Sequence, residues 1–377
     1  MFWQVVQEYQ SYGWAAFVVA VFATPLAMRV AKRFGVMDYP DTFLKPHGKA
    51  TPYLGGTAIC LAWMVALVLA LSNQAVDWHF LLPVLLGGVA ISILGLIDDV
   101  RGVSPKLRLL IGTGIIATVL IVTGAGWSLV DSFFSPPPLN IHIPPILAVP
   151  ASILISIILV LGACNSANMI DGLDGLCSGV TAIISLGFFL LAGHLAVWEF
   201  SAAGDPVRLI LSIAMLGAAI GFLPWNFNPA RIFMGDAGSM LLGYNCGMLI
   251  VLFAERGVFR WVIGALMIFA LPVFDTALAM FRRWRSGRSI FEGDRSHFYD
   301  QLVQRGISVR RTVFIAYLLT TFFVAVGLLV TVIRTRYAIP LYLIICLLMA
   351  TLAYATGLTH PEEQRPPADK TPPSEDQ

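Results

Sequence analysis

Eleven stretches of apolar residues, each about as long as a membrane-spanning helix, dominate this 377-residue sequence. A helix that crosses the hydrocarbon core of a bilayer needs about 20 mostly apolar residues. The stretches are 12–31, 54–72, 80–97, 108–127, 145–163, 176–197, 208–225, 238–254, 258–281, 312–333 and 338–357. They predict an all-α integral membrane protein with about eleven transmembrane helices.

The composition is that of a chain that folds in lipid. Hydrophobic residues make up 58% of the sequence and charged residues only 12%, whereas soluble domains carry about twice that charge. A soluble enzyme, a disordered protein and a secreted domain are therefore excluded. The net charge of +2 gives no reason to expect a nucleic-acid partner.

The basic residues predict the orientation of the chain. The first of them, Arg29, follows the first apolar stretch, which favours an N-terminus outside and, after eleven spans, a cytoplasmic C-terminus. On that topology 19 of the 24 Lys and Arg residues lie on the inner side. Residues 1–357 are predicted to form one polytopic membrane domain, and 358–377 a disordered cytoplasmic tail. Residues 131–145 are predicted to be a Pro-rich outer loop without helix.

Polar side chains gather on the predicted inner side, and the clearest group is Asp98 and Asp99 at the end of an apolar stretch. Neighbouring residues on a helix point about 100° apart, so the two carboxylates are expected to have different roles. The alternative reading is a helix-end cap balanced by nearby arginines. A cap needs only one carboxylate, however, and two adjacent ones repel each other, which favours a functional pair.

Two further inner segments carry carboxylates. In the first, side-chain oxygens recur every three residues, at Asn165, Asn168, Asp171 and Asp174. A straight α-helix would fan them around its axis, but a break at Gly172 or Gly175 would align them, and such a set suits Mg²⁺. In the second, Asp236 lies in a Gly-rich turn with Arg231 nearby as a phosphate partner. Asp236 can cap the next helix, face a phosphate, or do both.

The two remaining segments are basic. Lys45 and His47 precede a Gly-Gly turn, where they either anchor the chain at the membrane surface or bind substrate. Arg295 and His297 begin a short amphipathic helix predicted from an N-cap at Asp294 to Gly306. For these two we favour anion binding, and for the arginine run 282–288 a membrane-surface anchor. Asp275 could pair with Arg282, and its role stays open.

Carboxylates and amides for a divalent cation, surrounded by cationic groups for phosphates, are the equipment of metal-assisted phosphoryl transfer. A site at the membrane surface also suits one water-soluble and one lipid-borne phosphate. A multispan transporter is the alternative from another class. Transporters concentrate ionisable residues near the bilayer midplane, whereas here they lie at the inner ends of the spans.

Three motifs, IDDVRG (97–102), NSANMIDGLDGL (165–176) and FMGDAGS (233–239), occur in this order. They resemble the polyprenyl-phosphate N-acetylhexosamine-1-phosphate transferase family, and the likeness runs from about Lys45 to Arg305. That family includes undecaprenyl-phosphate N-acetylglucosamine-1-phosphate transferases and phospho-MurNAc-pentapeptide translocases. The eleven predicted spans are similar to the first branch, and the triple-histidine run typical of the translocases is absent.

The resemblance implies a multi-pass enzyme of the inner (plasma) membrane that starts a cell-envelope glycan. It would transfer a sugar 1-phosphate, most simply N-acetylglucosamine 1-phosphate, from a UDP-sugar to undecaprenyl phosphate, releasing UMP. Another UDP-sugar, including UDP-MurNAc-pentapeptide, is the alternative donor. The implied cofactor is Mg²⁺, with Mn²⁺ as the alternative ion. The number of chemical steps and the oligomeric state, a homodimer included, stay open.

The resemblance also implies roles for individual residues. Asp98 and Asp99 match the paired catalytic aspartates, and Asn168 and Asp236 match residues at the metal. The positions that line the nucleotide-sugar pocket correspond to Asn165, Asp171 and Asp174. Arg295 and His297 fall at a His-x-His motif near the diphosphate, whose second histidine is replaced here by Tyr299.

Overall fold

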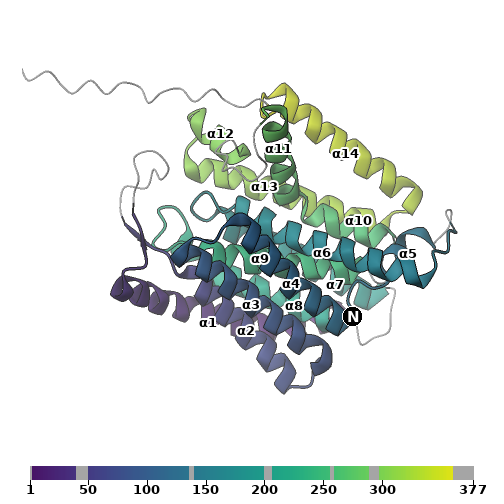
Figure 1. Ribbon diagram of the computed structural model, residues 1–377, viewed down its shortest axis with the longest axis horizontal. Helices are drawn as coiled ribbons and strands as arrows, with labels where there is room; N and C mark the ends of the chain where they lie inside the picture. Colours follow the sequence, from purple (N-terminus) through teal and green to yellow (C-terminus); the bar gives the residue numbers. More distant parts are fainter. Residues whose placement is uncertain are drawn as a thin grey trace, which may run out of the picture.

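The computed structural model describes residues 2–39, 50–135, 140–198, 206–254, 259–287 and 297–359, which form one bundle of helices (Figure 1). The helices are α1 (Phe2–Phe34), α2 (Gly55–Ser72), α3 (Trp78–Arg101), α4 (Pro105–Thr123), α5 (Leu129–Phe134), α6 (Pro145–Met169), α7 (Leu176–Trp198), α8 (Pro206–Asn226), α9 (Gly235–Ala254), α10 (Phe259–Ile268), α11 (Ala270–Arg285), α12 (Phe298–Gln304), α13 (Val309–Val332) and α14 (Thr335–Ala355). Two short strands, β1 (Met37–Asp38) and β2 (Thr51–Pro52), pair antiparallel. The predicted all-α class is confirmed.

Ten of the described helices are long and apolar enough to cross a membrane, and α10 with α11 makes an eleventh crossing if the bent pair is one span. The predicted stretch 258–281 is therefore not one straight helix, because α10 and α11 meet at an angle of 73°. Pro272, in the first turn of α11, favours a break at this place. Its ring lacks an N–H and would collide with the carbonyl of Ile268 in a continuous helix.

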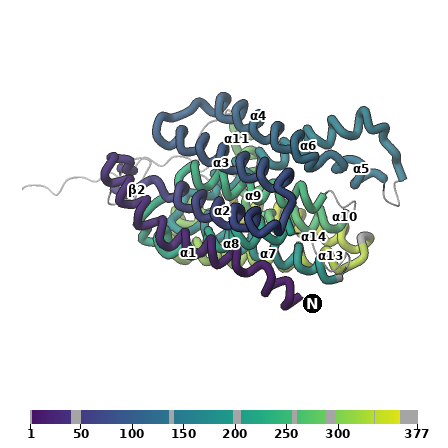
Figure 2. Tube along the Cα trace, turned by 90° about the horizontal axis from the view of Figure 1, so that it is seen from below, coloured from purple at the N-terminus to yellow at the C-terminus, as the bar shows by residue number. Residues whose placement is uncertain are grey.

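α9 is the central helix of the bundle. Every residue from Ala237 to Ala254 is buried, and α2, α3, α6, α7, α8 and α10 all pack on it. Figure 2 shows α4 and α6 along one side of the bundle and α1, α8 and α7 along the other. Glycines allow the closest approach: a Cβ at Gly247 would lie 2.7 Å from the Cα of Val160 on α6. The N-terminus of α9, which carries Asp236, is thus held in the middle of one end of the bundle.

One prediction about the loops needs correction. The outer segment 131–145 is not free of helix, because α5 covers its first four residues. The prolines begin only at Pro136, so nothing prevents residues 129–134 from forming a helical turn. Residues 136–139 lie outside the described part of the chain.

The C-terminal end of α14 is docked on the bundle rather than loose. Arg282 Nη1 and Gln301 Nε2 both donate to the carbonyl of Leu358, at 3.0 and 3.4 Å. Arg305 Nη2 donates to the carbonyl of Thr356 at 2.8 Å, and Thr359 is buried. The docked chain therefore extends two residues past the predicted boundary at 357. The rest of the predicted tail, 360–377, lies outside the described residues.

Candidate active site

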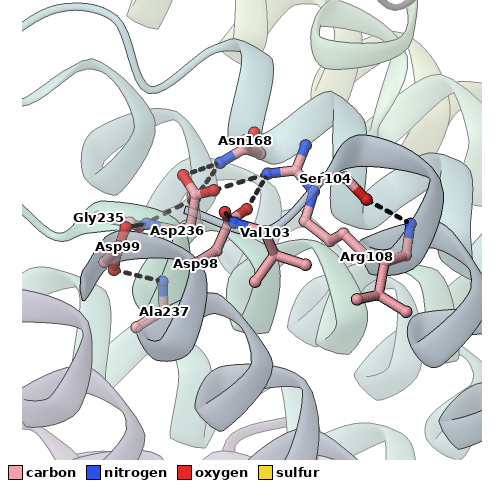
Figure 3. Close-up of polar contacts among 11 residues, drawn as sticks. Asp98, Asp99, Val103, Ser104, Arg108, Asn168, Gly235, Asp236 and Ala237 are labelled. Carbon is pink, nitrogen blue, oxygen red and sulfur yellow. Dashed lines mark hydrogen bonds and ion pairs between the residues drawn. The ribbon is translucent and has the colours of Figure 1, made fainter. Parts of the chain in front are cut away.

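The first functional contact joins the end of α3 to the beginning of α9. Asp99 accepts hydrogen bonds from the backbone N–H groups of Asp236 and Ala237, at 2.8 and 3.1 Å (Figure 3). These N–H groups have no partner inside their own helix, and the helix dipole there favours a negative charge. Asp99 therefore caps α9 from a different helix.

Asp98 has different partners, although it is the adjacent residue. Its Oδ1 accepts from the N–H of Val103 at 2.6 Å, and its Oδ2 lies 2.7 Å from Nη1 of Arg108. Gly102, with φ of +67°, turns the chain so that α4 begins only a few residues after α3 ends. The interpretation as a helix-end cap balanced by an arginine thus describes Asp98, whereas Asp99 caps a different helix.

Arg108 is the centre of the charged cluster. Its Nη1 lies 2.7 Å from Asp98 Oδ2 and 2.7 Å from Asp236 Oδ2, so one nitrogen bridges two carboxylates (Figure 3). The three side chains are only 12–22% exposed. On the sequence alone, the arginines near the Asp pair were considered only as balancing charges, and Arg108 was not predicted to be a site residue. Its position in the first turn of α4, just after the Asp pair, was the feature of the sequence that could have identified it as a site residue.

Asn168 completes this cluster from the last turn of α6. Its Nδ2 donates to Asp236 Oδ1 at 2.6 Å and to Ser239 Oγ at 3.1 Å. Among the described residues its amide oxygen accepts no hydrogen bond, so this oxygen is available to a ligand. The structure therefore brings together four of the predicted residues: Asp98, Asp99, Asn168 and Asp236.

The donor atoms of the cluster are of the kind that binds Mg²⁺. In the described part of the chain no three His, Cys, Asp or Glu side chains converge as a preformed metal site. The available donors are nonetheless carboxylate oxygens and the Asn168 amide oxygen, which are the hard ligands that Mg²⁺ takes in proteins. The guanidinium of Arg108 lies between two carboxylates, which shows that this position accommodates a positive charge. The residues fit a divalent cation.

The turn between α6 and α7 carries two further candidates with contrasting surroundings. Gly175, with φ of +78°, supplies the expected break. Asp174 Oδ2 accepts from Asn228 Nδ2 and from the N–H of Ala230, both at 2.9 Å, and so ties this turn to the one before α9. Asp171 accepts no hydrogen bond from a described residue. Burial, and then the charges of Asp236 and Asp99, raise the pKa of Asp171 well above its ordinary value.

The other predicted residues lie apart from the cluster or outside the description. Asn165 donates to the carbonyl of Leu161 in its own helix, at 2.8 Å. The guanidinium of Arg231 lies over the ring of Trp225, 5.9 Å from its centre. Lys45, His47 and Arg295 lie outside the described residues.

His297 is described, and its partner is Asp275: Nδ1 lies 2.7 Å from Asp275 Oδ2. The suggested pairing of Asp275 with Arg282 is therefore wrong. The predicted start of the short helix is also wrong, because the N-cap of α12 is His297 rather than Asp294, which lies outside the described residues. Gly306, with φ of +89°, does follow the end of this helix as expected.

Tyr53 is a second residue that the sequence did not reveal. The N–H of Phe233 donates to the carbonyl of Pro52, and Gly55 donates back to Phe233, both at 2.9 Å. This pairing sets the ring of Tyr53 edge-on against Phe233, with 6.4 Å between ring centres. Burial, and then the charges of Asp99 and Asp236, raise the pKa of Tyr53. Tyr53 therefore lies close to the carboxylate cluster, and its position just before Gly55 was the only signal.

Carboxylates gathered at the ends of membrane helices around the guanidinium of Arg108 point to an enzyme, and the comparisons with known proteins agree. The family model described as glycosyl transferase family 4 matches residues 81–254, a range that includes the whole charged cluster. A curated relative is 32% identical over 92% of this chain. The chain belongs to this family.

The names of individual relatives are more specific than the description of the family. The relative just mentioned is the probable undecaprenyl-phosphate N-acetylglucosaminyl 1-phosphate transferase of Bacillus subtilis, 92% of which is covered. The decaprenyl-phosphate N-acetylglucosaminephosphotransferase of Mycobacterium tuberculosis is 33% identical, over 83% of this chain and 80% of its own length. The phospho-N-acetylmuramoyl-pentapeptide-transferase of Chlorobaculum parvum is 30% identical, over 76% and 83%.

Proposed function

We propose that this protein transfers N-acetylglucosamine 1-phosphate from UDP-N-acetylglucosamine to undecaprenyl phosphate. An oxygen of the lipid phosphate forms a bond to the β-phosphorus of the donor. The bond from that phosphorus to the bridging oxygen breaks, and UMP leaves with the electron pair. The observation that carries the proposal is the group of Asp98, Asp99 and Asp236 around a cation position at one end of the bundle. The names of the first two relatives support the same reaction.

The residues of the cluster have distinct roles in this proposal. When bound, Mg²⁺ would supply positive charge to the donor diphosphate, and Asp236 with Asn168 would hold it. Asp99 fixes the N-terminus of α9 and thereby the position of Asp236. Asp98 deprotonates or orients the lipid phosphate beside Arg108, whose guanidinium then contacts that phosphate in place of a carboxylate. Asp171 faces the nucleotide sugar.

The position of the site suits two substrates of different solubility. The cluster is formed by the C-terminal ends of α3 and α6 and the N-terminal ends of α4 and α9, so it lies at one end of the membrane helices. A phosphate on a lipid and a nucleotide from water can meet there. In this proposal the end lies at the cytoplasmic face of the inner membrane, and the excess of basic residues on that side supports the orientation.

A second donor is favoured by one observation. The relative from Chlorobaculum parvum is named as a phospho-N-acetylmuramoyl-pentapeptide-transferase, which supports UDP-MurNAc-pentapeptide as the second candidate donor. A transporter is disfavoured, because the charged cluster lies at helix ends and the relatives named above are transferases.

The test is an assay with purified protein, undecaprenyl phosphate, Mg²⁺ and a panel of radiolabelled UDP-sugars. We expect lipid-linked product with UDP-N-acetylglucosamine, and none after addition of EDTA or with Asp236→Asn. No product with any donor, or product that is indifferent to EDTA and to Asp236→Asn, would overturn the proposal. Product only with UDP-MurNAc-pentapeptide would establish the second donor instead.

A further inference from the structure

A buried carboxylate on α11 holds the beginning of α12. Asp275 is only 1% exposed. Its Oδ2 lies 2.7 Å from Nδ1 of His297, and its Oδ1 accepts from the N–H of Phe298 at 3.0 Å. The N-cap residue His297 itself makes no side-chain cap, so Asp275 serves as the cap from another helix. Both carboxylate oxygens have partners, as a buried charge requires.

His297 in turn holds Tyr299. The two rings are parallel within 4°, with 5.4 Å between their centres. Tyr299 is 3% exposed, and its hydroxyl donates to the carbonyl of Met169 at 2.8 Å. Its ring also covers Gly172, where a Cβ would lie 2.6 Å from Cζ of Tyr299. The phenol therefore rests directly on the turn between α6 and α7.

We propose that Tyr299 is a positioning residue for this turn, and that Asp275, acting through His297, holds Tyr299 in place. Tyr299 then holds the beginning of the turn at Met169, and its end is held at Asp174 by Asn228 and Ala230 and at Gly175 by Asn226 and Tyr317. Asp171 lies between these held residues: its backbone N–H donates to the carbonyl of Asn168 at 3.2 Å, but its carboxylate accepts no hydrogen bond from a described residue. Asn168, in the charged cluster, immediately precedes Met169.

The inference explains the departure from the His-x-His pattern. An imidazole at position 299 is shorter than a phenol and could not reach the Met169 carbonyl from the same backbone position. Tyr299 therefore does not replace a histidine that binds substrate; its hydroxyl instead holds the turn between α6 and α7. A misplacement of about 1 Å in an active site can cost a factor of about 10² in rate, so the turn's position matters to the reaction.

The kinetic test uses Tyr299→Phe and Tyr299→His, and it rests on the proposed transferase reaction. We expect Tyr299→Phe to lower kcat about tenfold and to leave KM for the UDP-sugar within about threefold, because alignment is lost and not a ligand. Tyr299→His, which restores the family pattern, is expected to lower kcat at least as much. A rise in kcat or a fall in KM in Tyr299→His would overturn the inference.

The control is Tyr244→Phe. Tyr244 is also a buried tyrosine that donates to a backbone carbonyl, that of Val84 at 3.0 Å, but it lies between α9 and α3. The variant Tyr244→Phe should lower the melting temperature by about as much as Tyr299→Phe does, while its kcat stays within about twofold of the wild-type value. Equal losses of kcat in the two variants would mean that Tyr299 acts only on overall stability, and would overturn the inference.

Hydrogen–deuterium exchange provides a readout that does not need activity. The amides of residues 169–176 should exchange faster in Tyr299→Phe than in the wild type, and those of α8 should not change. Asp275→Asn should also make residues 169–176 exchange faster. Asp77→Asn, which alters the N-cap of α3, is the control and should leave their exchange unchanged. Unchanged exchange at 169–176 in both Tyr299→Phe and Asp275→Asn would overturn the inference. An inactive wild type would refute the proposed reaction and leave this test intact.

Discussion

Two aspartates in this protein do the same structural task in opposite electrostatic surroundings. Asp99 caps α9 and Asp275 caps α12, each from another helix. Beside Asp99 lie Asp98 and Asp236, bridged by the guanidinium of Arg108. Asp275 instead is buried against His297. The comparison teaches that several carboxylates gather beside one arginine at the proposed cation and phosphate site, whereas the buried pair of Asp275 and His297 lies at its proposed support.

The largest expected effect is a loss of kcat that occurs in the cluster around Asp99 and not in the region around Asp275. Asp236→Asn should lower kcat on the order of 10³-fold, because a charged group that acts on the transition state is lost. The melting temperature should stay near the wild-type value, since one of several mutually repelling carboxylates is removed. Activity assays and thermal unfolding in the same detergent measure both. A variant that loses stability in proportion to activity would break the comparison.

The next prediction is a loss of stability with little loss of activity. Asp275→Asn should destabilise the protein by about 2–3 kcal/mol, because a buried pair and a helix cap lose their charge. Its kcat should fall far less than that of Asp236→Asn. Thermal unfolding and kcat of the two variants, measured side by side, check this. A loss of kcat as large as that of Asp236→Asn would place Asp275 among the catalytic residues and contradict the contrast.

A smaller effect is expected at Arg108. Arg108→Gln removes the cation between Asp98 and Asp236, so the cluster should bind Mn²⁺ more tightly while kcat falls about 10- to 100-fold. Arg108→Lys keeps the charge and should retain more activity. Titration with Mn²⁺ followed by electron paramagnetic resonance measures the affinity. Unchanged affinity in Arg108→Gln would show that this arginine does not share the cation position.

The smallest effect concerns pH and the pair Asp171 and Asp174. Because the pKa of Asp171 is raised in the folded protein, folding favours its protonated form. That contribution is complete below the ordinary pKa and is lost as the pH rises toward the raised one. Asp171→Asn should therefore melt at a higher temperature than the wild type at about pH 8, and the difference should vanish near about pH 4.

Asp174→Asn is the matched variant for that measurement. Its carboxylate accepts two hydrogen bonds, so its loss should lower the melting temperature at neutral pH. If Asp171→Asn lowers the melting temperature as Asp174→Asn does, Asp171 has a structural partner after all, and its assignment to the substrate pocket is wrong.

Much of the site could be predicted because topology alone brings helix ends together. Asp98, Asp99, Asn168 and Asp236 stand at the ends of apolar stretches that face the same side, and in the fold they meet in one cluster. The break in the predicted span 258–281 could not have been predicted from Pro272 alone, because prolines also lie inside the unbroken helices α1, α3, α6, α8 and α14.

The remaining features depend on contacts between distant segments. The bridge from Arg108 to Asp236 joins residues 128 positions apart, and no local pattern encodes it. The same holds for Asp275 and His297, and for Tyr299 and the carbonyl of Met169, 130 positions away. A motif can show that a residue type has changed, as at Tyr299, but only the packing shows what the new side chain contacts.

The most direct test of the account follows the β-phosphorus. UDP-N-acetylglucosamine labelled with ³²P in the β-phosphate is incubated with the protein, undecaprenyl phosphate and Mg²⁺, and the lipid and nucleotide fractions are separated. The account predicts that the label moves to the lipid, that the released nucleotide is unlabelled UMP, and that neither occurs with Asp236→Asn. Label that remains with the nucleotide, as UDP, would mean transfer of the sugar alone and would contradict the account.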